Sequence, residues 1–286
     1  MSPVGSVWHC LIAVLVAIAW PAAAQSQGGH DFKVFDGTLY RDKPDMRRYG
    51  LTPIDILYAA RFWTDAHSLA AMDALPDEGT VRSVAREAAA AGAPVVVDIE
   101  HWRLSGDDAL MRANLAKYIT VLQWLRDEAP GLNLGYFGRL PMAAYAWALG
   151  SPYGGDYRRW QVENTRRAPL AVFVDAVYPP LYTYSDQRRA WVRYATANLR
   201  EARRYGRPVY AFLWPQYSEK SGKLALQFLP PDFWRLQLET VRAHADGVVI
   251  WGGWDDTRKG PADWDPAAPW WRVTREFLND QGLAAR

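Results

Sequence analysis

The sequence predicts an α/β fold in which parallel strands alternate with helices and close into a barrel. From residue 53 onward, short β-rich runs alternate with longer segments whose apolar residues recur at helical spacing. The short runs are rich in Val, which is typical of parallel strands buried on both faces. A barrel is the natural closure for such a series of strand and helix pairs.

Six runs qualify as strands, and in chain order they cover residues 54–59, 95–98, 132–137, 172–178, 209–212 and 248–251. The segments between them predict helices, and residues 270–279 predict a closing helix. One helix is indicated by Met111, Leu115, Tyr118, Leu122 and Leu125, which recur at helical spacing. A standard barrel has eight strands, and residues 31–50 and 216–230 leave room for more.

Glycine and proline mark the junctions between these elements. The triplets G-A-P at 92–94 and G-R-P at 206–208 each place a Gly where a helix ends and a Pro where the next strand begins. Gly131 and Gly247 are expected to end their helices in the same way. The punctuation therefore supports repeated helix-to-strand units.

The first 24 residues are typical of a secretory signal. An apolar run from Leu11 to Trp20 is followed by Pro21 and by three alanines that end at Ala24, an A-x-A cleavage pattern. We expect cleavage near Ala24 and a secreted or periplasmic bacterial protein without stable membrane insertion. No Lys or Arg precedes the apolar run, so an uncleaved anchor is the alternative, although the run is short for a membrane span.

Composition narrows the class of the protein further. The formal net charge is +2 without a basic run, so nucleic acid is not an expected partner. The single cysteine, Cys10, lies in the signal, which leaves a mature chain without disulfides and fits a bacterial envelope setting. Aromatic residues make up 14% of the chain, with 15 Trp and 15 Tyr. Some of these rings pack in the core, and the excess favours binding of sugar rings.

Two acidic residues follow the second predicted strand, at Asp98 and Glu100. Because strand side chains alternate, both face the same side, about 6 to 7 Å apart along the chain. In a partly dry pocket one of two such carboxyls keeps its proton and can act as a general acid. The other can orient a nucleophile that the substrate carries, such as a 2-acetamido oxygen. The alternative is an ion-paired strand end facing Arg61, Arg103 or Arg139.

The histidines do not predict a metal site. His101 alternates to the other face of the strand end and is expected to be structural. His30, His67 and His244 are isolated in the sequence, so no ligand set with metal-binding spacing is present. We therefore expect neither a metal nor another cofactor.

Four strand ends carry motifs in a fixed order: D-I-E-H-W-R at 98–103, Y-P-P-L-Y at 178–182, P-V-Y-A-F-L-W-P-Q-Y at 208–217, and G-V-V-I-W-G at 247–252 followed by W-D-D-T at 254–257. Together they resemble the hyaluronidase family of glycoside hydrolases, whose motifs are D-W-E-x-W-R, Y-P-S-I-Y, P-V-Y-V-F-T-R-P-x-Y, and G-V-V-L-W with W-E-N-T. The resemblance implies a distorted TIM-like (β/α) barrel of about seven strands. The chain then divides into a signal peptide (1–24), a leader that runs into the barrel (25–52) and a catalytic barrel (53–286).

The resemblance also implies roles for individual residues. Glu100 would be the acid/base, and Asp98 would hold and charge-stabilise the acetamido group as it attacks. Tyr182 would hydrogen-bond the same group, and Trp251 would form the wall against which it packs. These roles predict a secreted, hyaluronidase-like endo-N-acetylhexosaminidase that cleaves polysaccharide with retention and needs no cofactor.

The sequence departs from the family at several aromatic positions. Trp214 stands where the family has an arginine, and a tryptophan suits a neutral sugar face better than a uronic acid. Residues 135–141, G-Y-F-G-R-L-P, resemble the family's G-F-Y-x-F-P loosely and lead to Tyr136 and Tyr145 as candidates. With Trp102 of the first motif and Trp214, these tyrosines complete the side chains expected to bind substrate.

Two other readings remain open at this point. Glu100 could act with Asp255 or Asp256, just past the last strand, as a two-carboxylate glycosidase. The chain could also be a polysaccharide-binding barrel without catalysis, although the intact Asp98 and Glu100 argue against this. A metal-dependent deacetylase lacks a suitable His and Asp ligand set.

Overall fold

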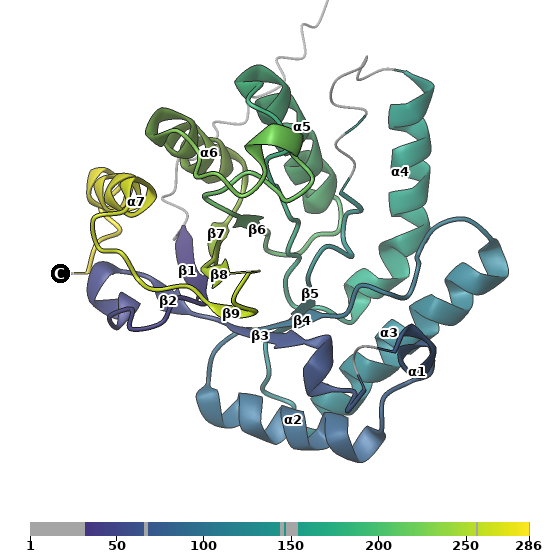
Figure 1. Ribbon diagram of the computed structural model, residues 1–286. Coiled ribbons are helices and arrows are strands. Elements are labelled where there is room, and N and C mark those ends of the chain that lie inside the picture. Colours follow the sequence, from purple (N-terminus) through teal and green to yellow (C-terminus); the bar gives the residue numbers. More distant parts are fainter. Residues whose placement is uncertain (1–31, 66–67, 144–145, 147–153, 256, 286) are drawn as a thin grey trace, which may run out of the picture. The chain divides into compact units, whose positions relative to one another are not determined.

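The computed structural model describes residues 32–65, 68–143, 146, 154–255 and 257–285 (Figure 1). Some predictions lie outside the described residues, namely those for the signal at 1–24, the start of the leader at 25–31, His30, His67, Tyr145 and Asp256. Asp31–Arg286 forms one compact unit.

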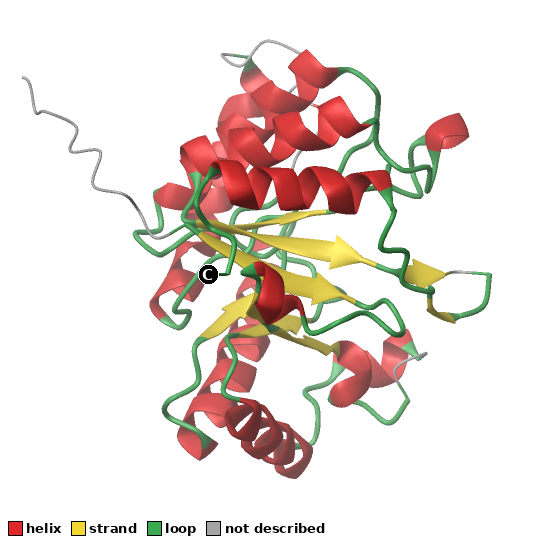
Figure 2. Ribbon diagram, turned by 90° about the vertical axis from the view of Figure 1, so that its left-hand side faces the viewer, coloured by secondary structure: helices red, strands yellow, loops and turns green. Residues whose placement is uncertain are grey.

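Parallel strands form the centre of this unit. They are β1 (Lys33–Thr38), β2 (Thr52–Pro53), β3 (Asp55–Tyr58), β4 (Val95–Asp98), β5 (Leu134–Tyr136), β6 (Tyr210–Leu213) and β7 (Gly247–Gly252). Two sheets run in the orders β2-β1-β7-β6 and β3-β4-β5, and every pairing in them is parallel. Figure 2 shows these strands pointing the same way, so their carboxyl ends gather at one edge.

Two connections close these sheets into a ring. On one side, residues 177–180 bridge β5 and β6 through the parallel pairs Phe137↔Tyr178 and Pro180↔Phe212. On the other side, β2 and β3 are one extended run, which pairs with β1 at its start and with β4 afterwards. The described residues thus form a distorted barrel of seven extended segments, which confirms the predicted fold class. The strand that sequence reasoning did not locate is β1, which lies within the predicted leader.

Helices surround the barrel (Figure 1). They are α1 (Leu69–Asp73), α2 (Glu78–Ala91), α3 (Asp108–Glu128), α4 (Gly155–Arg167), α5 (Arg188–Arg203), α6 (Pro231–His244) and α7 (Pro269–Asp280). Asp77 and Asp107 cap α2 and α3 by accepting backbone N–H groups, and Gly92 ends α2 in the left-handed conformation, at φ 68°. No helix in the described part of the chain combines the length and hydropathy of a membrane span.

Short elements complete the described structure. Single 3-10 turns occur at η1 (Met46–Tyr49), η2 (Ala59–Arg61), η4 (Ala168–Val172) and η5 (Gly222–Leu224). The strands β8 (Trp254–Asp255) and β9 (Gly260–Pro261) form an antiparallel hairpin that projects beyond the carboxyl ends of the barrel strands (Figure 2). Residues 216–230 form loops, η5 and two isolated bridges, from Gln216 to Phe228 and from Tyr217 to Thr183.

The barrel interior is filled by one layer of apolar side chains, formed by Phe35, Val96, Phe137, Ala176, Tyr178, Phe212 and Val249. A larger core fills the space between the strands and the helices. At Gly135 an added Cβ would lie 2.5 Å from the Ala176 carbonyl oxygen, so only glycine allows these backbones to approach. Because side chains alternate along a strand, the residues two positions after this layer face the open end of the barrel.

Candidate active site

A cavity of about 540 Å³ lies at the carboxyl edge of the barrel. Its wall includes Asp98, Glu100, three aromatic residues at strand ends, Trp254 of the β8–β9 hairpin and four cations. Asp98, Trp214 and Trp251 each follow a residue of the interior layer by two positions, which explains why they face this opening. In barrel enzymes of this kind the active site lies at this edge.

Asp98 is the last residue of β4 and is the more deeply placed of the two acids. Its Oδ1 atom is buried and has no hydrogen-bond partner among the described residues. Burial, and then the charge of Glu100, raise the pKa of Asp98 to about 7, against the opposing effect of Arg139. Near neutral pH, therefore, a proton resides on Asp98 in a large share of the free molecules.

Glu100 stands two residues further on, with 58% of its side chain exposed. Arg139 Nη2 donates to its Oε2 at 3.2 Å, and Arg139 Nη1 donates to its backbone oxygen at the same distance. Arg139 is itself held by the Phe137 carbonyl and the Tyr118 hydroxyl. Glu100 thus forms one of the ion pairs expected if Asp98 and Glu100 only stabilise a strand end. An exposed pair of this length contributes little to stability, however.

Three rings form an aromatic wall, which we define as Tyr182, Trp214 and Trp251. Tyr182 is nearly parallel to Trp251 at 5.9 Å between ring centroids, and Trp214 meets Trp251 edge-on at 4.9 Å. The Trp214 indole N–H donates to Gln216 at 2.9 Å, so the ring is fixed from its edge. Burial raises the pKa of Tyr182 well above its usual value, which keeps its hydroxyl protonated as a donor. The wall offers apolar faces beside one hydroxyl group.

Tyr58 lies in the wall of a neighbouring cavity and contacts this site through Trp251, and it is not among the predicted site residues. It ends β3 in register with Asp98, and its hydroxyl accepts the indole N–H of Trp251 at 3.0 Å. Burial raises the pKa of Tyr58, and the charge of Asp98 adds to that effect. Its place at a strand end was a usable signal, but the family motifs begin only after residue 94. Trp254, 41% exposed on the hairpin, is a second ring that was not predicted to bind substrate.

The structure corrects two predicted substrate-binding residues, Trp102 and Tyr136. They are 1% and 2% exposed, and both lie in the core between the strands and the helices. The Trp102 indole donates to the Met72 carbonyl at 2.9 Å, and the Tyr136 hydroxyl donates to the Tyr118 carbonyl at 2.9 Å. Neither ring can reach a ligand in the cavity, whereas Phe137, one residue further along, lines it.

The remaining candidates lie away from the cavity wall. Asp255 accepts the backbone N–H of Thr257 at 2.9 Å and pairs with Arg258 at 3.3 Å, so it stabilises the hairpin turn. His101 contacts the Met72 carbonyl through Nε2 at 2.8 Å and is half-buried, and burial lowers its pKa. No group of three or more His, Cys, Asp or Glu side chains suited to a metal was found among the described residues.

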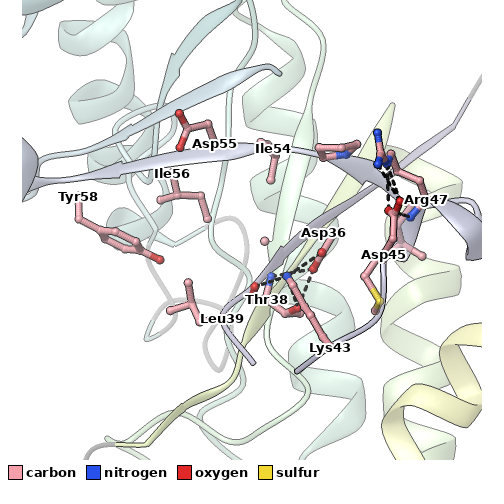
Figure 3. Close-up of a pocket in the computed structure, with 14 residues that line it drawn as sticks. Asp36, Thr38, Leu39, Lys43, Asp45, Arg47, Ile54, Asp55, Ile56 and Tyr58 are labelled. Carbon is pink, nitrogen blue, oxygen red and sulfur yellow. Dashed lines mark hydrogen bonds and ion pairs between the residues drawn. The ribbon is translucent and has the colours of Figure 1, made fainter. Parts of the chain in front are cut away.

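A second cavity, of about 320 Å³, lies where β1 and β3 part (Figure 3). Lys43 stands in this gap and donates to Asp36 Oδ2 at 2.7 Å and to Thr38 Oγ1 at 3.1 Å. Asp36 also accepts the Thr38 backbone N–H and hydroxyl. The charges of Lys43 and Asp36 are paired within this cluster, and the cluster therefore stabilises the barrel at the gap between β1 and β3.

Comparison with known proteins places the fold in a class. No family profile matches the sequence, and no curated protein matches it. Among solved structures, bee venom hyaluronidase in complex with a hyaluronic acid tetramer aligns with a TM-score of 0.56 at 16% identity, over 88% of this chain and 97% of that one. Its monoclinic crystal form gives 0.57, also at 16% identity, over 88% and 98%. GH26C from a Muricauda species gives 0.47 at 15% identity, over 82% and 67%. At such identities the likeness concerns the fold, which is the TIM barrel found in glycoside hydrolases.

Proposed function

We propose that this protein is a glycoside hydrolase that cleaves N-acetylhexosamine-containing polysaccharide with retention at the anomeric carbon. One observation carries the proposal: a buried carboxyl, Asp98, lies beside an exposed one, Glu100, in an aromatic-walled cavity at the carboxyl edge of the barrel. A pair of acids with such unequal surroundings can divide the proton-donating and charge-stabilising roles.

In the proposed reaction the acetamido oxygen of the substrate attacks C1 while Glu100 gives its proton to the departing glycosidic oxygen. A water molecule then attacks C1, Glu100 takes the proton of that water, and the ring formed by the acetamido group opens. Each displacement inverts C1, so the product keeps the original configuration. Asp98 forms no bond to the sugar in either step.

The free protein and the substrate complex would differ in where the proton resides. In the free protein burial favours the protonated form of Asp98. An acetamido N–H pointing at its unpartnered Oδ1 would stabilise the carboxylate and lower its pKa in the complex. Tyr182 would donate to the acetamido oxygen, and Trp251 would pack against its methyl group.

A second candidate is a two-carboxylate glycosidase. Glu219, in the loop after β6, lines the same cavity and could take the role first considered for Asp255 or Asp256. In this second mechanism a carboxylate either bonds to the sugar, with retention, or activates the attacking water, with inversion, whereas in the first mechanism the acetamido group attacks.

The first test is incubation of the purified protein with neutral and N-acetylhexosamine-containing polysaccharides, followed by measurement of new reducing ends. We expect release only from polymers with acetamido groups, and only with Asp98 and Glu100 intact. Binding without release by the unmodified protein would instead support the non-catalytic alternative.

Export is also part of the proposal. The signal pattern that ends at Ala24 favours a secreted or periplasmic location. Sequencing the amino terminus of protein recovered from outside the cytoplasm tests this, and a retained Leu11 to Trp20 segment would contradict it.

A further inference from the structure

A buried arginine with unsatisfied donors lines the catalytic cavity. Arg167, the last residue of α4, is only 4% exposed and belongs to the cavity wall. Its Nε atom is buried and has no hydrogen-bond partner in the described part of the chain. Its Nη2 atom lies 3.1 Å from the sulfur of Met142, which is a weak acceptor. The guanidinium therefore has capacity for a stronger acceptor.

No acid on the described residues neutralises this guanidinium by a direct ion pair. The carboxylate of Glu163 is nearby: its Oε1 accepts from Arg166 at 2.7 Å, and its Oε2 is buried without a hydrogen-bond partner among the described residues. Burial, and then the charge of Arg139, lower the pKa of Arg167 to about 10, so the group stays protonated at neutral pH. Its position at the end of α4 gives it the favourable field of the helix dipole, which offsets only part of the cost of a buried, unpaired charge.

The cavity around Arg167 is basic as well. Arg103, Arg139 and Lys220 also line it, and Arg139 is the one that contacts Glu100. Arg103 and Lys220 are exposed and form no ion pair within the described residues. These four cations outnumber the acids of the wall, Asp98, Glu100 and Glu219, and Asp98 holds a proton in much of the free protein. Positive charge therefore prevails in this cavity near neutral pH and attracts anions.

We propose that Arg167 binds an anionic group of the sugar polymer, either a carboxylate or a sulfate ester. The planar guanidinium suits both groups, because each offers oxygens for paired hydrogen bonds. The inference rests on the proposed function in that the ligand is a sugar chain. The tryptophan at position 214, in the loop after β6, led to the expectation of neutral sugars. Arg167 revises that expectation, because it supplies a cation to the same cavity from α4.

Binding measurements in a Glu100→Gln background test this inference without cleavage of the ligand. The ligands are an N-acetylglucosamine tetramer, its 6-O-sulfated form and a hyaluronan tetrasaccharide, which carry no charge, sulfate and carboxylate respectively. We expect Arg167→Gln to weaken binding of at least one acidic ligand by roughly 10- to 100-fold, the range for hydrogen bonds to a charged group. The acidic ligand that is affected identifies the group. Binding of the neutral tetramer should change by less than about twofold.

Matched variants separate ligand binding from a structural role. Arg200→Gln removes an exposed arginine of α5 and should leave binding of all three ligands unchanged. Arg167→Met retains the apolar contact with Met142 without the charge, and we expect its midpoint of thermal unfolding to stay level or rise.

Three outcomes would overturn the inference: equal loss of binding for all ligands, no loss for either acidic ligand, or binding of the neutral tetramer alone by the parent protein. The last result would leave the proposed function standing. If none of the three ligands binds the parent, both proposals fail together.

Discussion

The indole N–H of Trp251 donates to the hydroxyl oxygen of Tyr58 at 3.0 Å. This bond joins the carboxyl ends of β7 and β3 over the gap where β1 and β3 part. The hydrogen bond fixes the edge of the Trp251 ring, and the face of that ring lies beside Tyr182. The aromatic wall therefore depends on a residue from the other side of the gap.

Tyr58→Phe is expected to loosen this wall without unfolding the barrel. A single such hydrogen bond contributes about 1 kcal/mol, so kcat/KM should fall roughly fivefold. Steady-state kinetics on an acetamido-bearing oligosaccharide provide the measurement, and Tyr49→Phe is the control, because Tyr49 ends η1 and packs on Trp271 outside both cavities. Equal kinetics for the two variants would show that the bond does not shape the site.

Asp98→Asn should stabilise the protein in alkaline solution. The folded pKa of Asp98, about 7, exceeds its usual value, so the folded state holds the proton more tightly than the unfolded state does. The resulting stability is present below about pH 4 and is lost as the pH rises to 7, by an amount on the order of a few kcal/mol. Asparagine has no such loss.

Urea unfolding at pH 5 and pH 8 measures this effect. The wild-type protein should lose more unfolding free energy between these values than Asp98→Asn does, whereas Asp127→Asn, an exposed control, should follow the wild type. If Asp98→Asn is instead less stable at pH 8, Asp98 serves as a stabilising ion-pair partner and its proposed role is wrong.

Glu100→Gln should abolish turnover, since it removes the proposed proton donor for the glycosidic oxygen. General acid help is typically worth about 10²- to 10⁴-fold, most with poor leaving groups. Glu219→Gln is the matched control, because it removes another carboxyl of the same cavity. The rate at which each variant releases reducing ends decides between the mechanisms. A greater loss of this rate in Glu219→Gln than in Glu100→Gln would favour the two-carboxylate alternative.

Lys43→Met should lower the stability of the barrel at the gap between β1 and β3. The variant leaves the Asp36 carboxylate, with 12% of its side chain exposed, without its cation. The expected loss of unfolding free energy is about 1 to 3 kcal/mol, typical of a buried polar group that loses its partner. Arg47→Met breaks the exposed pair with Asp45 nearby (Figure 3) and should destabilise the protein much less than Lys43→Met does. Similar denaturation midpoints for both would contradict the structural role of Lys43.

Strand alternation explains which parts of the site could be predicted from the sequence. Asp98 and Trp251 continue the face of β4 and β7 that fills the barrel, so a hydrophobic run and a two-residue period suffice to place them. Trp102 was predicted from the motif at 98–103 and not from alternation, and because β4 ends at Asp98 the alternating face does not continue to it. The loose motif at 135–141 predicts Tyr136 as a substrate-binding residue, but Tyr136 lies on the other face of β5. Its neighbour Phe137 faces the cavity.

Other features needed the tertiary structure. The β1 sequence, K-V-F-D-G-T, mixes polar residues and glycine with two apolar ones, so it has no clear strand signal until β7 pairs with it. Arg167 belongs to a helix, and no local pattern indicates that the end of α4 reaches the cavity. Its unsatisfied donors become visible only when the surrounding side chains are in place.

The stereochemistry of the product gives the sharpest test of the role of Asp98. If the acetamido group attacks, proton NMR of the first product should show the retained anomer, and no carboxylate should carry a covalent sugar. Asp98→Asn should then lower kcat by far more than it changes KM, since the charge on the acetamido group develops in the transition state. A thiazoline analogue of the cyclised sugar should also bind less tightly to Asp98→Asn. An inverted product, or a sugar adduct on Glu219 detected by mass spectrometry, would rule this mechanism out.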